Sequence, residues 1–282
     1  MGLAGTELLV KDGWYVTMFD FNAEGAKVAA KLGEQVLFVQ GNALVYDDQV
    51  RAFKQTWDKW GRIDVVWANA GFGDAQDFFR PAAAVEGEDG MLTPPRPNTL
   101  TVDVCLTGVI FTTYLALHFF RKTPTRPGKL ILQSSVNGLW PNSRLILYSA
   151  AKHGVVGLTR ALAARLRETD EQISVNAICP GLVDTPLISS TMIDNIPAHM
   201  KTPMSTIMRA FSDIVHDQAN TSGQVLEASG PDVIPKDPPP YGNDATEYIV
   251  ELRYRDLIDV GVLAKHGEER GKARKAMEVA PA

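Results

Sequence analysis

Short apolar runs alternate with amphipathic stretches over the first 180 residues of the chain. The runs are rich in Val, Ile, Leu and Phe and have the length of buried strands, while the stretches between them repeat apolar residues with a helical period. The expected strands are Tyr15–Phe19, Val36–Val39, Asp64–Ala68, Lys129–Ser134 and Ile173–Cys179. The expected helices are Gly2–Lys11, Ala23–Leu32, Asp47–Trp60, Thr99–Phe120 and Tyr148–Arg167.

This alternation predicts an α/β fold with a doubly wound, mostly parallel sheet, because strands joined by helices of ten or more residues pair in parallel through right-handed crossovers. Ligands in such sheets bind beyond the carboxyl ends of the strands. Two proline-containing stretches, Phe72–Pro97 and Val233–Tyr241, are expected to be irregular. We therefore expect one α/β domain over residues 1–232, followed by a Pro-rich linker and a charged helical tail over residues 233–282.

Composition and net charge limit the classes of partner that the chain is expected to bind. The 282 residues are 45% hydrophobic and 22% charged, with a formal net charge of -5, which disfavours nucleic acid and anionic membranes as partners. The two cysteines, Cys105 and Cys179, stand in apolar runs and are expected to be buried free thiols. The start lacks the pattern of a secretory signal, and no apolar run reaches the length of a membrane span, so a cytoplasmic location is expected.

The segment Ser134–Ala163 carries the pattern most typical of chemistry. Tyr148 and Lys152 are four residues apart at the start of a predicted helix and so share a face, and Ser135 ends a predicted strand. A phenol with a pKa near 10 becomes a base at neutral pH only if about 4 kcal/mol favours the phenolate. A neighbouring ammonium acts in that direction. Ser135 could hold a substrate oxygen against the Tyr148 hydroxyl.

These three residues, together with ANAG at 68–71 and ICPGLVDT at 178–185, resemble the short-chain dehydrogenase/reductase family, and within it the hydroxyprostaglandin dehydrogenase-like branch of fungi. The resemblance covers residues 1–229. It implies a Rossmann fold, hydride transfer to or from a nicotinamide, and Ser135, Tyr148 and Lys152 as the catalytic residues. It also implies a homodimer or homotetramer and a role in secondary metabolism.

The resemblance also implies a cofactor site. Its expected residues are Gly2, Asp20, Asn42, Asn69, Ala70, Gly71, Tyr148, Lys152, Pro180, Gly181, Val183 and Thr185. Asp20 ends a predicted strand, where a carboxylate accepts hydrogen bonds from ribose hydroxyls and repels a 2′-phosphate, so NAD is expected rather than NADP. Alternatively, Asp20 caps the helix beginning at Ala23. The NAG and PG segments could likewise be simple turns after strands.

The chain departs from the family pattern in two places. Of the family's glycine-rich phosphate loop only Gly2 is present, and the preceding strand is absent, so we expect a misassigned or truncated start. A chain without that strand is expected to be poorly soluble and to bind NAD weakly. Cys105 stands where the family has an asparagine in the proton relay, and a thiol forms only weak hydrogen bonds.

The function expected from these features is NAD-dependent interconversion of a hydrophobic secondary alcohol and its ketone. The alternative is a catalytically silent family member that acts as a binding or oligomer subunit. No GxSxG, HExxH or CxxC pattern supports a hydrolase or metal enzyme, and no metal site is expected. Apolar residues are expected to form the substrate wall, or else to pack a lid without touching the substrate: Phe72, Trp140, Leu145, Leu187, Ile188 and Met192.

Overall fold

The protein is described by a computed structural model in which residues 1–74, 76–79, 83–86, 90–169, 171–185, 187 and 190–251 are placed. Its contacts divide the chain into a unit from Met1 to Asp237 and a unit from Pro238 to Ala282. The expected boundary after residue 232 is therefore too early. Strand β9 (Asp232–Pro235) pairs with the strand before it and belongs to the first unit. The prolines of this stretch had indicated a linker instead of a strand.

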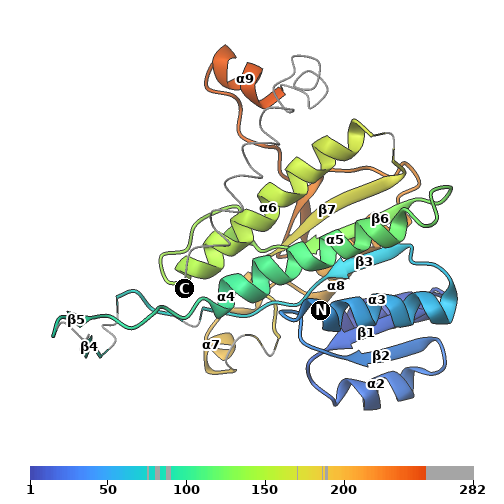
Figure 1. The fold of residues 1–282 in the computed structure, drawn as a ribbon, viewed down its shortest axis with the longest axis horizontal. Helices are drawn as coiled ribbons and strands as arrows, with labels where there is room; N and C mark the ends of the chain where they lie inside the picture. The colour runs from blue at the N-terminus through green and yellow to red at the C-terminus, as the bar shows by residue number, and fades with distance from the viewer. Residues whose placement is uncertain are drawn as a thin grey trace. The chain divides into compact units, whose positions relative to one another are not determined.

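The first unit holds a mostly parallel sheet of the predicted Rossmann-like type (Figure 1). The parallel strands β3 (Val65–Ala68), β6 (Gly128–Gln133), β7 (Ile173–Pro180) and β8 (Val225–Ser229) lie side by side, and β9 is antiparallel to β8. Strands β1 (Val16–Asp20) and β2 (Val36–Gln40) form a separate parallel pair. Within the placed residues, β1 and β3 are thus edge strands that do not pair with each other.

Helices cover both faces of this sheet. Strand β6 shows the division, because Leu130 and Leu132 belong to one core and Ile131 to the other, as alternation along a strand requires. The first core includes side chains of helices α3 (Tyr46–Trp60), α5 (Gly108–Phe120) and α6 (Ile146–Arg167). The second includes side chains of α1 (Gly2–Lys11) and α8 (Met204–His216). Helix α2 (Gly25–Leu32) packs on β1 and β2.

The helix predicted over Thr99–Phe120 is not regular. It consists of α4 (Leu100–Val102), a π-helical turn over Asp103–Thr107, and α5. By length and composition Leu100–Phe120 could cross a membrane, but α5 packs on α3, β3 and β6 as a core helix does. The π turn places Cys105, fully buried, at the irregular point, and such turns are common at functional sites.

Other elements were not expected from the sequence. A small antiparallel hairpin, β4 (Val85–Glu86) and β5 (Leu92–Thr93), interrupts the stretch predicted to be irregular. Helices α7 (Ser190–Asp194) and α8 follow β7. By contrast, α9 (Asp244–Glu251) of the second unit falls in the tail that was predicted to be helical; the charged run at 265–275 lies beyond the placed part of the chain.

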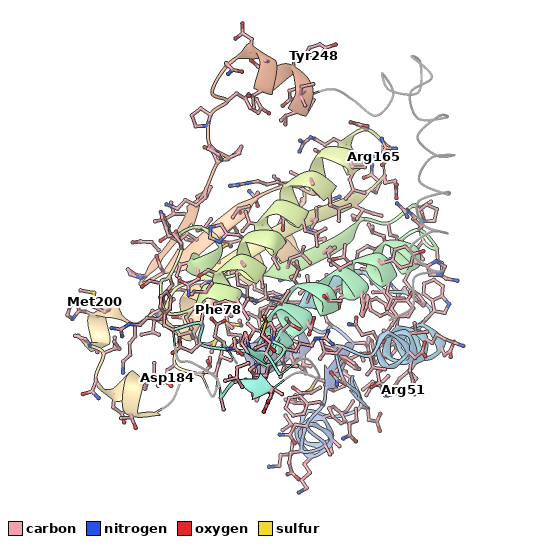
Figure 2. The ribbon with its side chains drawn as sticks, turned by 60° about the vertical axis from the view of Figure 1, so that its left-hand side comes forward. Arg51, Phe78, Arg165, Asp184, Met200 and Tyr248 are labelled. Atoms are coloured by element: carbon pink, nitrogen blue, oxygen red, sulfur yellow. The ribbon has the colours of Figure 1, made fainter. Side chains whose placement is uncertain are left out.

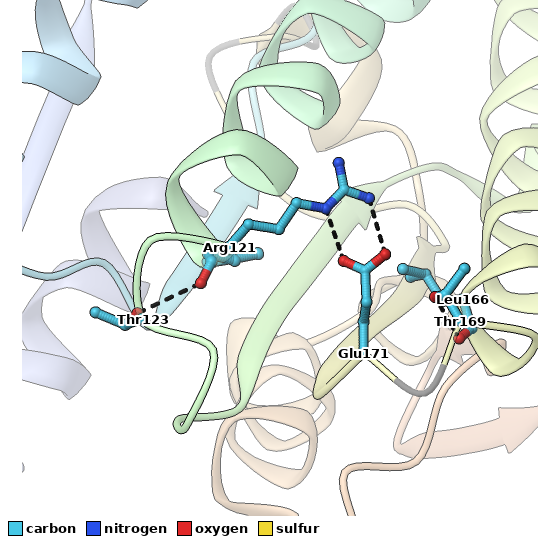
Figure 3. Close-up of polar contacts among 6 residues, drawn as sticks. Arg121, Thr123, Leu166, Thr169 and Glu171 are labelled. Atoms are coloured by element: carbon cyan, nitrogen blue, oxygen red, sulfur yellow. Dashed lines mark hydrogen bonds and ion pairs between the residues drawn. The ribbon is translucent and has the colours of Figure 1, made fainter.

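A surface ion pair connects two elements at the amino ends of the central strands (Figure 3). Arg121, which follows α5, donates from Nε and Nη2 to the Oε2 and Oε1 atoms of Glu171, at 2.7 and 3.0 Å. Nearby, Thr169 Oγ1 donates to Leu166 O at the end of α6. The carboxyl ends of the same strands lie at the opposite side, where Figure 2 shows Phe78, Asp184 and Met200.

Candidate active site

Helix α6 presents Tyr148 and Lys152 in its first two turns. Lys152 is only 1% exposed; its Nζ donates to Gln133 O at 2.8 Å and lies 5.4 Å from the centroid of the Tyr148 ring. Burial lowers the pKa of the Lys152 ammonium. The last residue of β6 therefore holds the lysine beside the tyrosine, as the spacing of the two residues predicted.

Ser135 reaches the same place from the end of β6. Its backbone is extended, and its Oγ accepts a hydrogen bond of 3.1 Å from Asn137 N at the start of the 3₁₀ helix Val136–Gly138. A side-chain hydrogen bond between Ser135 and Tyr148 favours the phenolate and lowers the Tyr148 pKa. The three predicted catalytic residues are thus adjacent.

Close packing fixes the approach of the serine segment to α6. Ser134 Oγ donates to Lys152 O at 2.9 Å, which anchors the end of β6 on the helix. A Cβ at Gly138 would lie 2.3 Å from Ser134 Oγ and 2.6 Å from Lys152 O, closer than atoms can approach. Only glycine fits at position 138, and any side chain there would push the Ser135 segment away from Tyr148.

The environment of the Tyr148 hydroxyl differs from the one expected. The pKa of Tyr148 is raised to about 12, mainly by burial; Cys105, Cys179 and Asp74 act in the same direction, while the hydrogen bond with Ser135 acts against them. Lys152 alone therefore does not lower the pKa of Tyr148, because burial penalises the phenolate more than its surroundings stabilise it; the lowering predicted from Lys152 together with a positively charged nicotinamide stays a prediction. Tyr148 carries its proton at neutral pH.

The Asn69–Gly71 loop follows β3 and reaches the lysine. A Cβ on Gly71 would lie 3.7 Å from Lys152 Nζ and 4.0 Å from Cys105 Sγ. Asn69 Oδ1 is buried and has no hydrogen-bond partner among the residues that the structure describes. Gly2, the first residue of α1, lies against the same side chain, since a Cβ there would be 3.0 Å from Asn69 Nδ2. Gly2, Asn69, Ala70 and Gly71 thus form one continuous edge of the site.

The Cys105 thiol is hydrogen-bonded to the backbone that continues this loop. Phe72 N donates to Cys105 Sγ at 3.2 Å, and the thiol donates back to Phe72 O at 3.3 Å. The thiol therefore holds the backbone just after Gly71. The sequence predicted weak hydrogen bonding here, but not this paired contact.

Two further loop contacts were missed by sequence reasoning. Thr101 Oγ1 donates to Gly73 O at 2.7 Å, and the carboxylate of Asp74 accepts from the backbone amides of Leu147 and Tyr148. One signal was present in the sequence: the residue at the N-cap of α6 is Leu145, which cannot cap a helix with its side chain.

Asp20 is the last residue of β1, and Asn42 follows β2. Asp20 Oδ1 accepts from Asn22 N at 2.9 Å, and α2 begins only at Gly25, so Asp20 does not cap that helix. Asn42 Oδ1 accepts from Leu44 N at 3.0 Å. Both side chains are exposed. Asp20 keeps carboxylate oxygen available for ribose hydroxyls, and an adenine amino group would have to share the Asn42 oxygen with the turn.

The predicted nicotinamide segment, Pro180 to Thr185, leaves the carboxyl end of β7. Gly181 N donates to Ala228 O at 2.9 Å, and a Cβ on Gly181 would lie 2.7 Å from Thr202 Oγ1. Val183 is buried and Thr185 is partly exposed. Because Gln133 of β6 pairs with Ile178 of β7, this segment emerges next to Ser135.

The structure describes only some of the apolar side chains that were predicted to surround the substrate. Phe72, Trp140 and Leu187 are 41%, 50% and 46% exposed, and Leu145 is partly exposed. Ile188 and the side chain of Met192 lie outside the described residues. The exposed apolar residues suit a hydrophobic ligand.

The residues present fit a dinucleotide cofactor. The buried Asn69 Oδ1 lacks a partner within the described part of the chain, Gly71 leaves room beside Lys152 Nζ, and only one of the three lysine N–H groups is needed for Gln133 O. A buried acceptor without a partner is costly unless a ligand satisfies it. Asn69, Gly71 and Lys152 are therefore suited to hold polar groups of a bound nucleotide.

Comparisons with known proteins identify relatives of this chain. The short chain dehydrogenase profile matches residues 1–195. The chain is 36% identical over 229 residues to short-chain dehydrogenase/reductase prx7 of Penicillium rubens, covering 80% of each chain. It is 32% identical to the bovine (Bos taurus) 15-hydroxyprostaglandin dehydrogenase [NAD(+)] over 67% of this chain and 66% of that one.

A solved structure shares the fold. It is a 3-ketoacyl-(acyl-carrier-protein) reductase from Brucella melitensis complexed with NADH, with a TM-score of 0.65 and 23% identity over 81% of this chain and 92% of that one. The predicted family resemblance is confirmed by these matches. The chain belongs to the short-chain dehydrogenase/reductase family of oxidoreductases, which act on CH–OH donors.

Proposed function

We propose that this oxidoreductase uses NAD to interconvert a hydrophobic secondary alcohol and its ketone, with Tyr148 as the acid and base. The observation that carries the proposal is the buried Lys152 Nζ, held by Gln133 O beside a Tyr148 ring whose hydroxyl is hydrogen-bonded to Ser135. Burying an ammonium is costly, so its position beside a phenol calls for a chemical role.

The chain's own residues provide binding and proton transfer. A bound nicotinamide would supply or accept the hydride. Ser135 donates a hydrogen bond to the substrate oxygen and holds it against the Tyr148 hydroxyl. In the direction of reduction, Tyr148 gives its proton to that oxygen, and its pKa of about 12 keeps the proton in place until it is needed. In oxidation the phenolate takes the proton back, a form favoured by positive charge nearby.

Asp20 supports NAD as the cofactor. Its exposed carboxylate ends β1, and a negative charge there would repel the 2′-phosphate of NADP. Lys152 would also bind ribose hydroxyls, and Pro180, Gly181, Val183 and Thr185 would hold the nicotinamide end. The name of the bovine relative also specifies NAD(+).

The substrate is proposed to be a hydrophobic secondary metabolite. The exposed side chains of Phe72, Trp140 and Leu187 support an apolar substrate. A 33% identical relative from Dothistroma septosporum is named 5'-hydroxyaverantin dehydrogenase and is covered to 65%. We further propose a cytoplasmic homodimer or homotetramer; the exposed Ile110 and Tyr114 on α5 support an oligomer seam, and the two buried free thiols support a reducing compartment.

The experiment is a cofactor and substrate screen on the 282-residue chain. Thermal unfolding is followed with NAD, NADH, NADP or NADPH, and NADH formation is then measured with a panel of hydrophobic secondary alcohols. We expect stabilisation by NAD and NADH above that by the phosphorylated forms, and turnover of at least one alcohol. A chain that none of the four dinucleotides stabilises, and that oxidises none of the alcohols, would instead be a silent family member.

A further inference from the structure

The catalytic helix α6 begins without a cap of its own. Its N-cap residue, Leu145, makes no side-chain hydrogen bond to the helix, so the first backbone amides need acceptors from elsewhere. Asp74 supplies them from the loop after β3: Oδ1 accepts from Tyr148 N at 2.6 Å, and Oδ2 accepts from Leu147 N at 3.2 Å. One carboxylate thus binds two consecutive amides, one of which belongs to Tyr148 itself.

The loop that carries Asp74 is fixed by contacts on its other side. Cys105 holds both backbone groups of Phe72, and Thr101 Oγ1 donates to Gly73 O. The same loop begins at Gly71, beside Lys152 Nζ. The loop that carries Asp74 therefore connects the π-helical turn around Cys105 with the first turn of α6.

We infer that Asp74 is a positioning residue for Tyr148, which fixes the first turn of the catalytic helix and sets the charge around the phenol. The inference rests on the proposed function, because it assigns a role toward the same acid/base. Asp74 acts through the backbone of α6, and it accounts for how a helix that starts with apolar residues presents a catalytic side chain at its third position.

Two physical effects follow from the carboxylate. Its two charge-assisted hydrogen bonds fix the Tyr148 backbone, and its negative charge offsets the positive end of the α6 dipole. The groups that act on the phenol are Cys105 on the π turn, Cys179 on β7, Asp74 on the loop, Ser135 after β6 and Lys152 on α6. Burial is the main cause of the raised pKa of Tyr148 and Cys105 the next; Asp74 acts in the same direction with a smaller effect, so removing its charge should lower this pKa slightly.

The test compares Asp74→Asn with a matched control, Asp217→Asn. Asp217 also accepts from two backbone amides, Ala219 N at 2.9 Å and Thr221 N at 2.6 Å, but in the turn after α8. Asparagine keeps the shape of the side chain and loses the charge and one of the two acceptor oxygens. If the effect were only a general loss of capping, the two variants should behave alike. If Asp74 positions Tyr148, amide exchange, the Tyr148 pKa and kcat should change only in Asp74→Asn.

The first measurement does not depend on turnover. Amide hydrogen exchange at Leu147 and Tyr148 should become at least about tenfold faster in Asp74→Asn, the effect of losing a hydrogen bond to a charged group. The spectroscopic pKa of Tyr148, isolated by subtracting the titration of the Tyr148→Phe form of each variant, should fall. Asp217→Asn should leave both unchanged. Equal exchange rates and an equal pKa in wild type and Asp74→Asn would overturn the inference.

The second measurement is kinetic. Asp74→Asn should lower kcat by roughly tenfold or more, keep NAD affinity within about twofold, and move the pH profile of alcohol oxidation toward lower pH. If kcat and the pH profile match those of Asp217→Asn, the positioning role is refuted. If the wild type turns over no alcohol, the proposed function fails, and the exchange and titration results still decide whether Asp74 holds Tyr148.

Discussion

The raised pKa of Tyr148 predicts an effect on alkaline stability that can be measured without a substrate. The ordinary pKa of the group is 10.0, and in the folded protein burial raises it to about 12. Since a pKa difference of one corresponds to about 1.36 kcal/mol, losing this proton costs the folded protein about 3 kcal/mol more than it costs the unfolded chain. A group whose pKa is raised by folding contributes fully below the unfolded value and loses its contribution as pH rises through the folded one.

Replacing Tyr148 by Phe removes this dependence. Between about pH 9 and about pH 11.5, wild type should lose about 2 kcal/mol more of its free energy of unfolding than Tyr148→Phe. Other tyrosines are common to both proteins and cancel in the difference. Near pH 8 the variant should differ by only about 1 kcal/mol, for the lost hydrogen bond with Ser135.

Urea unfolding at several pH values, followed by circular dichroism, gives these free energies. Tyr114→Phe is the matched control, because this tyrosine is 67% exposed on α5 and its substitution should leave the wild-type pH dependence unchanged. If wild type and Tyr148→Phe lose equal stability over the alkaline range, the burial argument for Tyr148 is wrong.

Three other variants test separate parts of the account. Asp20→Ala combined with Phe21→Arg should raise kcat/KM with NADP relative to NAD, because the repulsion of a 2′-phosphate is removed; a wild type that already prefers NADP would refute the assignment. Cys105→Asn should raise kcat in steady-state assays with little change in NAD affinity, because an amide forms stronger hydrogen bonds than a thiol; an unchanged or lower rate would show that this protein has a different relay. Glu171→Gln should cost at most about 1 kcal/mol at neutral pH, as for other exposed ion pairs. Arg121 lowers the pKa of Glu171 below 4.5, so in urea unfolding the Glu171→Gln difference should disappear as pH falls from 4.5 through the folded value; a difference that persists in acid would contradict this.

Local patterns predicted which of the candidate site residues lie together. Tyr148 and Lys152 share a helix face because of their spacing, and Ser135 and Asn69 each follow a strand whose carboxyl end lies at the ligand-binding edge. Such inferences need only the period of an element and the direction of a parallel strand. The helices and strands up to β3 were predicted from the same periodic patterns.

Contacts between distant segments could not be predicted in this way. Asp74 lies 74 residues before the amide of Tyr148, and nothing in the loop sequence indicates which helix it caps. Whether folding raises or lowers the pKa of Tyr148 depends on how deeply the folded chain buries the phenol, and the spacing of charged residues does not reveal this. The π turn around Cys105 was missed because the apolar pattern continues through it.

The central claim is that Tyr148 transfers the proton in an NAD-dependent reaction. The most direct test measures NADH formation from a hydrophobic secondary alcohol by wild type and Tyr148→Phe, with NAD binding followed in parallel by thermal unfolding. We predict that turnover falls by at least about 100-fold in the variant while NAD affinity stays within a few fold, since only the proton-transferring hydroxyl is removed. Comparable turnover by Tyr148→Phe would contradict the account.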